Sequence, residues 1–117
     1  MKVSIVTIVF NNREHIADCI QSVNSQSYHD IEHIVIDGGS TDGTREIIES
    51  HREHIDKYVS EPDKGLYDGL NKGLMMASGD IIGILHSDDL FYNTSVIDDI
   101  VRAFASEESD IVYGNGI

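Results

Sequence analysis

Residues 3–10 read VSIVTIVF, and this stretch decides which fold class the chain can adopt. β-Branched residues dominate it, and apolar residues stand at both odd and even positions, so both of its faces need to be covered. A strand of this kind is typical of the interior of a parallel sheet that carries helices on each side. We therefore predict that this run is the first strand of an α/β domain.

Four more short apolar runs follow, and helical patterns separate them. We predict further strands at residues 31–37, 57–60, 81–85 and 110–114. Helices are expected after the turn at residues 11–12, after a cap at residues 40–42, over residues 65–77 and around residues 96–104. Such alternation implies a mostly parallel sheet with right-handed crossovers and helices on both faces.

Two of the predicted helices show which residues should face the sheet. In the first, the inward stripe is Ile16, Cys19, Ile20 and Val23, and Cys19 is best interpreted as a small core residue. In the helix at residues 65–77, the predicted inward stripe is Leu66, Tyr67, Leu70, Leu74 and Ala77. Gly69 and Gly73 weaken that helix and can permit close packing on the sheet.

Length and charge exclude several classes of protein. The chain has 117 residues, which suits a single domain or part of one. Eight Lys and Arg against 21 Asp and Glu give a net charge of -13, so nonspecific nucleic-acid binding is not expected. A lone cysteine and the absence of a run long enough to span a bilayer favour a cytoplasmic protein.

Unusual residues follow the predicted strands, where the loops of an open α/β sheet bind ligands. Asp88 and Asp89 are two adjacent carboxylates, which suit Mg²⁺ or Mn²⁺ or, equally, the N-terminus of the next helix. Asp37 precedes two glycines and can bind a heterocycle with N–H donors or belong to an ordinary tight turn. Phe10 can stack on a planar base or lie in the core, and Lys64 can neutralise phosphate or face solvent.

Four sequence blocks in this order resemble the nucleotide-binding half of family 2 inverting glycosyltransferases of GT-A fold. The blocks are VSIVTIVFNN from residue 3, VIDGGSTDGT from residue 35, EPDKGLYDGLNKG from residue 61, and ASGD at residues 77–80 leading to HSDD at 86–89. The middle blocks look most like bacterial enzymes that build surface polysaccharides such as colanic acid. The resemblance covers nearly the whole chain, so residues 1–117 are expected to form the donor-binding half of a glycosyltransferase domain.

The resemblance implies a role for each matching residue. Phe10 would pack against the base of a nucleoside-diphosphate sugar of UDP or GDP type, and Asp37 would bind that base. Asp88 would contact the ribose or the metal, and Asp89 would hold a Mg²⁺ or Mn²⁺ ion on the diphosphate, with Lys64 nearby. The acceptor would be a saccharide or lipid-linked molecule, and the enzyme would work in the cytoplasm, free or at the inner face of the membrane.

The sequence also departs from the family pattern. Ile8 stands where many relatives have Pro or Thr, and His86 where they have Asp or Asn. Family domains are roughly twice this length, and no residue here matches the general base, which we expect beyond Ile117. The 117-residue chain is therefore expected to bind the donor without catalysing transfer, and the surface left open by truncation favours self-association.

Two other functions fit parts of the pattern. A noncatalytic nucleotide-sugar binding module would need the same donor site and no base. A phosphoacceptor signalling domain also alternates strands and helices over about this length, but it needs an acidic pair after the first strand. Here Asn11 and Asn12 follow the first strand and the acidic pair follows the fourth, which disfavours the signalling domain.

Overall fold

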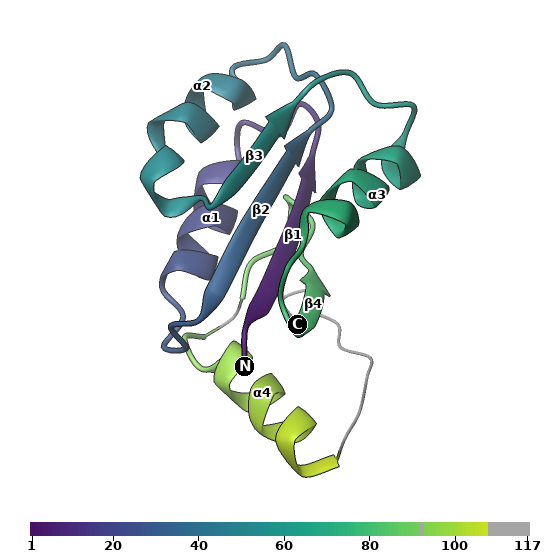
Figure 1. Ribbon diagram of the computed structural model, residues 1–117. Helices are drawn as coiled ribbons and strands as arrows, with labels where there is room; N and C mark the ends of the chain where they lie inside the picture. The colour runs from purple at the N-terminus through teal and green to yellow at the C-terminus, as the bar shows by residue number, and fades with distance from the viewer. Residues whose placement is uncertain (92, 108–117) are drawn as a thin grey trace.

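The computed structural model describes residues 1–91 and 93–107 (Figure 1). The elements in chain order are β1 (Val3–Val9), α1 (Ile16–Asn24), β2 (Ile31–Asp37), α2 (Thr44–Ser50), the 3₁₀ helix η1 (Arg52–His54), β3 (Lys57–Ser60), α3 (Leu66–Met76), β4 (Ile81–Ile84) and α4 (Val96–Glu107). Four predicted strands and all four predicted helices are confirmed. The strand predicted at residues 110–114 lies outside the described residues.

The described strands form one parallel sheet in the order β3-β2-β1-β4. β1 pairs with β2 along its whole length, from Val3 opposite Ile31 to Val9 opposite Asp37. On its other edge β1 pairs with β4, and β2 pairs with β3 on the far side. The run at residues 3–10 is therefore an interior strand, as predicted.

Helices cover both faces of this sheet (Figure 1). The odd residues of β1 pack against α1 and its neighbours, where Ile16, Cys19, Ile20 and Val23 are all buried. The even residues Val6 and Ile8 pack on the opposite face with Met76 and Ala77 at the end of α3. Burial raises the pKa of the Cys19 thiol to about 12, which agrees with its predicted place in the core.

The predicted inward stripe of α3 is wrong at Leu66, Tyr67 and Leu74, whereas Ala77 packs against the core as predicted. Leu66, Tyr67 and Leu74 are exposed, with Tyr67 at 80%, whereas Gly69 and Gly73 are the buried residues of this helix. A Cβ on Gly73 would overlap Cγ1 of Val6, so the backbone of α3 lies directly on the sheet. Periodicity marks a contact face by its large apolar residues and therefore misses a face that is made of glycine.

The start of α2 also differs from the prediction. The cap residue is Gly43, which has a left-handed backbone (φ 106°) that a side chain rarely adopts. Asp42, one residue earlier, accepts hydrogen bonds from the amide and hydroxyl of Thr44 at 3.0 and 2.5 Å. The carboxylate predicted to cap the helix therefore acts from just outside the cap position.

A buried carboxylate ties the amino-terminal end of the sheet together. Glu32 on β2 forms an ion pair with Lys57 at 2.5 Å and accepts hydrogen bonds from Ser4 at 2.8 Å and from Ser78 at 2.9 and 3.1 Å. Burial alone would raise the pKa of Glu32, but these hydrogen bonds outweigh it and lower the pKa to about 2. Glu32 therefore joins β1, β2, β3 and the segment before β4.

None of the helices in the described ranges is long and apolar enough to cross a membrane.

We predict that Gly73→Ala destabilises the protein by about 1–2 kcal/mol in urea unfolding. The added methyl must displace the buried Val6 side chain, and that cost exceeds the gain in helix propensity. Met75→Ala is the matched control on the same helix because Met75 is 88% exposed, and its effect should stay within about 0.5 kcal/mol. Equal effects of the two variants would contradict the packing of α3 described here.

We also predict that Glu32 makes the free energy of unfolding decrease at low pH. Its pKa is lower in the folded chain, so its contribution is complete above its ordinary value of 4.5 and is lost as the pH falls toward about 2. Between pH 6 and pH 3 the wild type should lose at least about 1 kcal/mol more stability than Glu32→Gln, which has no carboxylate to protonate. Urea unfolding at both pH values measures this difference, and parallel losses would contradict it.

Candidate functional site

Three loops meet at the carboxyl edge of the sheet, where β1, β2 and β4 end (Figure 1). The loop after β1 is bonded to the loop after β2: Asn11 N–H donates to Ser40 Oγ, and Thr41 N–H donates to Asn11 Oδ1, both at 2.8 Å. Asn11 has a left-handed backbone (φ 50°), which asparagine tolerates better than most residues. The next amide, that of Asn12, donates to Thr44 Oγ1 at 2.9 Å. These bonds hold the two loops as one unit.

Asp37 is buried at the end of β2 and is fully engaged with its own loops. Its carboxylate accepts hydrogen bonds from the hydroxyl and amide of Ser40, the latter at 3.1 Å, and from Ser60 Oγ at 2.7 Å. These bonds link the ends of β2 and β3. Asp37 is completely buried, so a ligand can contact it only if these loops rearrange, and the ordinary tight turn that the sequence allows describes its present contacts.

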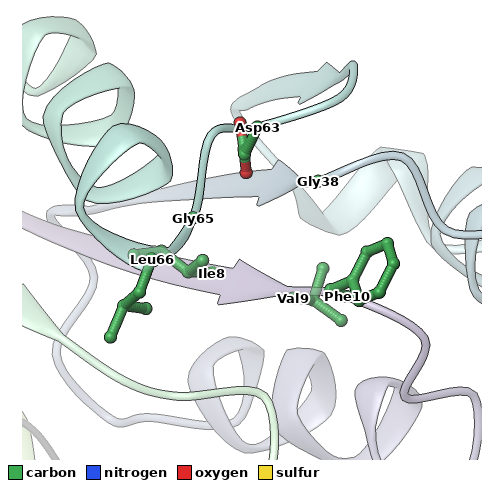
Figure 2. A pocket seen from close by; sticks show the side chains of 7 residues that line it. All are labelled: Ile8, Val9, Phe10, Gly38, Asp63, Gly65 and Leu66. Carbon is green, nitrogen blue, oxygen red and sulfur yellow. The ribbon is translucent and has the colours of Figure 1, made fainter.

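A pocket of about 370 Å³ opens beside these strand ends (Figure 2). Its lining residues are Ile8, Val9, Phe10, Gly38, Asp63, Gly65 and Leu66. The wall is mostly apolar and carries one carboxylate, that of Asp63. A mostly apolar concave site with a few polar groups is the usual form of a small-molecule site.

Two predicted nucleotide-binding residues lie at this pocket in different ways. Phe10 lines it and is 61% exposed, so the ring is not part of the core and is accessible to a ligand. Lys64 lies on the exposed rim between two lining residues, Asp63 and Gly65, and is not itself in the wall. Its amide donates to Asp68 at 3.0 Å, which fixes the loop that carries it.

The acidic pair, Asp88 and Asp89, follows β4, and a hydrogen bond joins Asp88 to the loop after β1. The side-chain amide nitrogen of Asn12 donates to Asp88 Oδ1 at 2.5 Å and to Ser87 Oγ at 3.0 Å. The side-chain oxygen of Asn12 lies 2.9 Å from His15 Nδ1. The Asp88 side chain is 77% exposed, while Asp89 is half-buried. Neither carboxylate lines the pocket, and Asn12 links Asp88 to the segment that carries Phe10.

The structure adds two site residues that the sequence analysis did not select. Asp63 lies in the pocket wall, and Asn12 positions Asp88. Asp63 belongs to the block EPDKGLYDGLNKG, which carries the family resemblance, but the resemblance assigned no role to this residue. Asn12 follows the first strand, but nothing in the sequence shows which carboxylate its amide reaches.

Comparison with known proteins identifies the family. Residues 4–117 match the model of glycosyl transferase family 2. The chain belongs to this family. It is 40% identical over 106 residues to Rv1514c, an uncharacterized glycosyltransferase of Mycobacterium tuberculosis, a match that spans 90% of this chain and 40% of the relative. It is 30% identical over 118 residues to a PGL/p-HBAD biosynthesis glycosyltransferase of Mycobacterium bovis, covering 97% of this chain and 46% of that protein.

Solved structures of glycosyltransferases share this fold. Staphylococcus aureus TarS, residues 1–349 in complex with UDP-GlcNAc, superposes with a TM-score of 0.84 at 25% identity, over 94% of this chain and 33% of that one. The mannosyltransferase PcManGT of Pyrobaculum calidifontis, in complex with GDP-Man and Mn²⁺, gives 0.82 at 25% identity, over 89% and 32%. The GT-A fold predicted from the sequence is confirmed, and the chain spans less than half the length of these relatives.

We predict that Asp37 and Asp88 differ in their contribution to stability. Asp37→Ala should cost about 2–3 kcal/mol in urea unfolding, because it leaves Ser40 and Ser60 without their buried acceptor. Asp88→Ala should change stability by no more than about 0.5 kcal/mol, because its carboxylate is largely in solvent. Similar losses for both variants would show that Asp37 is not the link between the loops.

Proposed function

We propose that this chain binds a nucleoside-diphosphate sugar at the carboxyl edge of its sheet, as the donor half of a glycosyltransferase. The observation that carries the proposal is the placement of three features on joined loops: an apolar pocket with an exposed aromatic ring, a glycine-lined wall, and an acidic pair. The ring of Phe10 would stack on the base, beside Gly38. Relatives with this fold bind UDP-GlcNAc and GDP-Man, which supports a donor of UDP or GDP type.

Each predicted donor-binding residue keeps its part in this proposal. Asp37 would bind the base after exchanging a bond to Ser40 or Ser60, and Lys64 on the rim would approach the diphosphate. Asp88, held by Asn12, would contact the ribose or the cation. The net charge of -13 opposes binding of a diphosphate, so Lys64 and a cation would both be needed to offset it.

The acidic pair fits a divalent cation that arrives with the diphosphate. Within residues 1–91 and 93–107, no group of three or more His, Cys, Asp or Glu side chains is arranged to enclose a metal ion. Mg²⁺ and Mn²⁺ commonly bind one or two carboxylates and complete their shell with water and substrate phosphates. Asp89 and Asp88 can supply those carboxylates, and Asn12 engages one oxygen of Asp88 while the side chain stays exposed. When bound, the ion would neutralise charge on the leaving nucleoside diphosphate.

In the whole enzyme, the acceptor would be a saccharide or lipid-linked molecule and transfer would invert the sugar. An acceptor hydroxyl would attack the anomeric carbon on the face opposite the leaving diphosphate, while a general base takes the hydroxyl proton. We expect that base beyond Ile117.

Calorimetric titration of UDP and GDP tests the donor site. With Mn²⁺ present, at least one of the two nucleotides should bind, and EDTA or Asp89→Asn should weaken that binding by at least about tenfold. Asp30→Asn is the matched control, because this exposed carboxylate precedes the amino end of β2 at the opposite edge of the sheet. A nucleotide affinity that is unchanged by EDTA and by Asp89→Asn would contradict the role of a metal ion. The absence of binding by both nucleotides would contradict the donor site.

A further inference from the structure

Asp63 places a nearly buried carboxylate in an otherwise apolar pocket. Its side chain is 9% exposed, and its neighbours in the wall are Ile8, Val9, Phe10, Leu66 and two glycines. A carboxylate in such surroundings is costly unless a cation or hydrogen-bond donors compensate for its lost hydration. The chain provides one compensating group from α3.

That group is Lys72. Its Nζ lies 2.5 Å from Asp63 Oδ1, 3.0 Å from Glu61 and 3.7 Å from Asp68. The hydrogen bonds to Asp63 and Glu61 raise the pKa of Lys72, so the ammonium stays charged. Glu61 lies at the surface, away from the pocket wall, and Asp63 is the one of these three carboxylates that lines the pocket.

Two glycines fix where the other oxygen of Asp63 lies. A Cβ added to Gly38 or to Gly69 would stand 2.9 Å from Asp63 Oδ2, so this oxygen sits between β2 and α3 where side chains are missing. Figure 2 shows the Asp63 side chain pointing from its loop toward the end of β2 near Gly38. Oδ1 is therefore held by Lys72, and Oδ2 lies beside Gly38, which also lines the pocket.

Asp63 also differs from Asp37 in its free bonding capacity. Both oxygens of Asp37 already accept hydrogen bonds from Ser40 or Ser60. Among the described residues, the side chain that donates to Asp63 is Lys72, and it does so through Oδ1. Asp63 can accept a ligand hydrogen bond through Oδ2 without losing its partner.

We propose that Asp63, positioned by Lys72, accepts a hydrogen bond from a ring N–H of the bound base and thereby selects the class of base. This inference rests on the donor site proposed above. An ionised carboxylate only accepts hydrogen bonds, so it favours uracil and guanine, which carry a ring N–H on their pairing edge. Cytosine and adenine present a ring nitrogen lone pair at that place, which the carboxylate repels.

The test compares UDP with CDP and GDP with ADP, each with Mn²⁺, by calorimetric titration. Within at least one of these pairs, the base with the ring N–H should bind at least about tenfold tighter, as expected for a hydrogen bond to a charged group. In Asp63→Asn and Lys72→Gln this preference should fall below about threefold, because an amide can also donate and an unheld carboxylate can turn away. Lys72→Arg should retain the preference, since arginine also pairs with carboxylates.

Glu61→Gln is the matched control. It removes the charge of another partner of Lys72 but leaves the pocket wall unchanged, so the preference between bases should stay as in the wild type. Thermal unfolding of every variant accompanies the titrations. A purely structural role for Asp63 or Lys72 would weaken both members of a pair alike and leave their ratio unchanged, and that result would overturn the inference.

The outcomes separate this inference from the donor site itself. Equal binding of both members of each pair, or a preference that persists in Asp63→Asn, would overturn the role of Asp63 while the donor site stands. A persistent preference would point to Asp37 as the residue that selects the base. No binding of any of the four nucleotides would overturn both proposals.

Discussion

The whole architecture depends on β1 being paired on both edges and covered on both faces. β2 and β4 occupy its edges, α1 covers one face, and α3 lies on the other. Its carboxyl end is therefore held on all sides, and the loop that follows starts from a fixed point. Because parallel strands end at the same edge, the loops after β2 and β4 are brought to this point as well.

The two ends of the sheet use their carboxylates differently. Glu32 is bonded to its lysine and serine partners at the amino end, with a pKa of about 2. At the carboxyl end, Asp63 and Lys72 lie at the pocket, and the side chain of Asp88 faces solvent. Among the carboxylates proposed to meet the ligand, Asp63 and Asp88 keep bonding capacity free, whereas Asp37 is bonded to Ser40 and Ser60 and also stabilises the fold.

Most of the fold could be predicted from the sequence, because β1, β2 and β4 are short β-branched runs and the first helix has a clear apolar stripe. The close packing of α3 through Gly69 and Gly73 could also be anticipated, but the exposure of its large apolar residues could not, because periodicity assigns such residues to the contact face. Phe10 and the acidic pair could be selected as candidate site residues. The role of Asn12 could not, because its bond to Asp88 joins loops that lie far apart along the chain, and the role of Asp63 could not, because it depends on how α3 packs beside the end of β2.

β2 carries a bonded carboxylate near each of its ends, and this has a consequence for how the strand finds its partners. A shift of β2 by one residue would turn Glu32 away from Ser4 and Lys57, and Asp37 away from Ser60. The apolar residues between them, Ile34, Val35 and Ile36, are too alike to exclude such a slip by packing alone. Glu32 and Asp37 therefore specify the register of β2, because pairing it in a shifted register would bury a carboxylate without its partners.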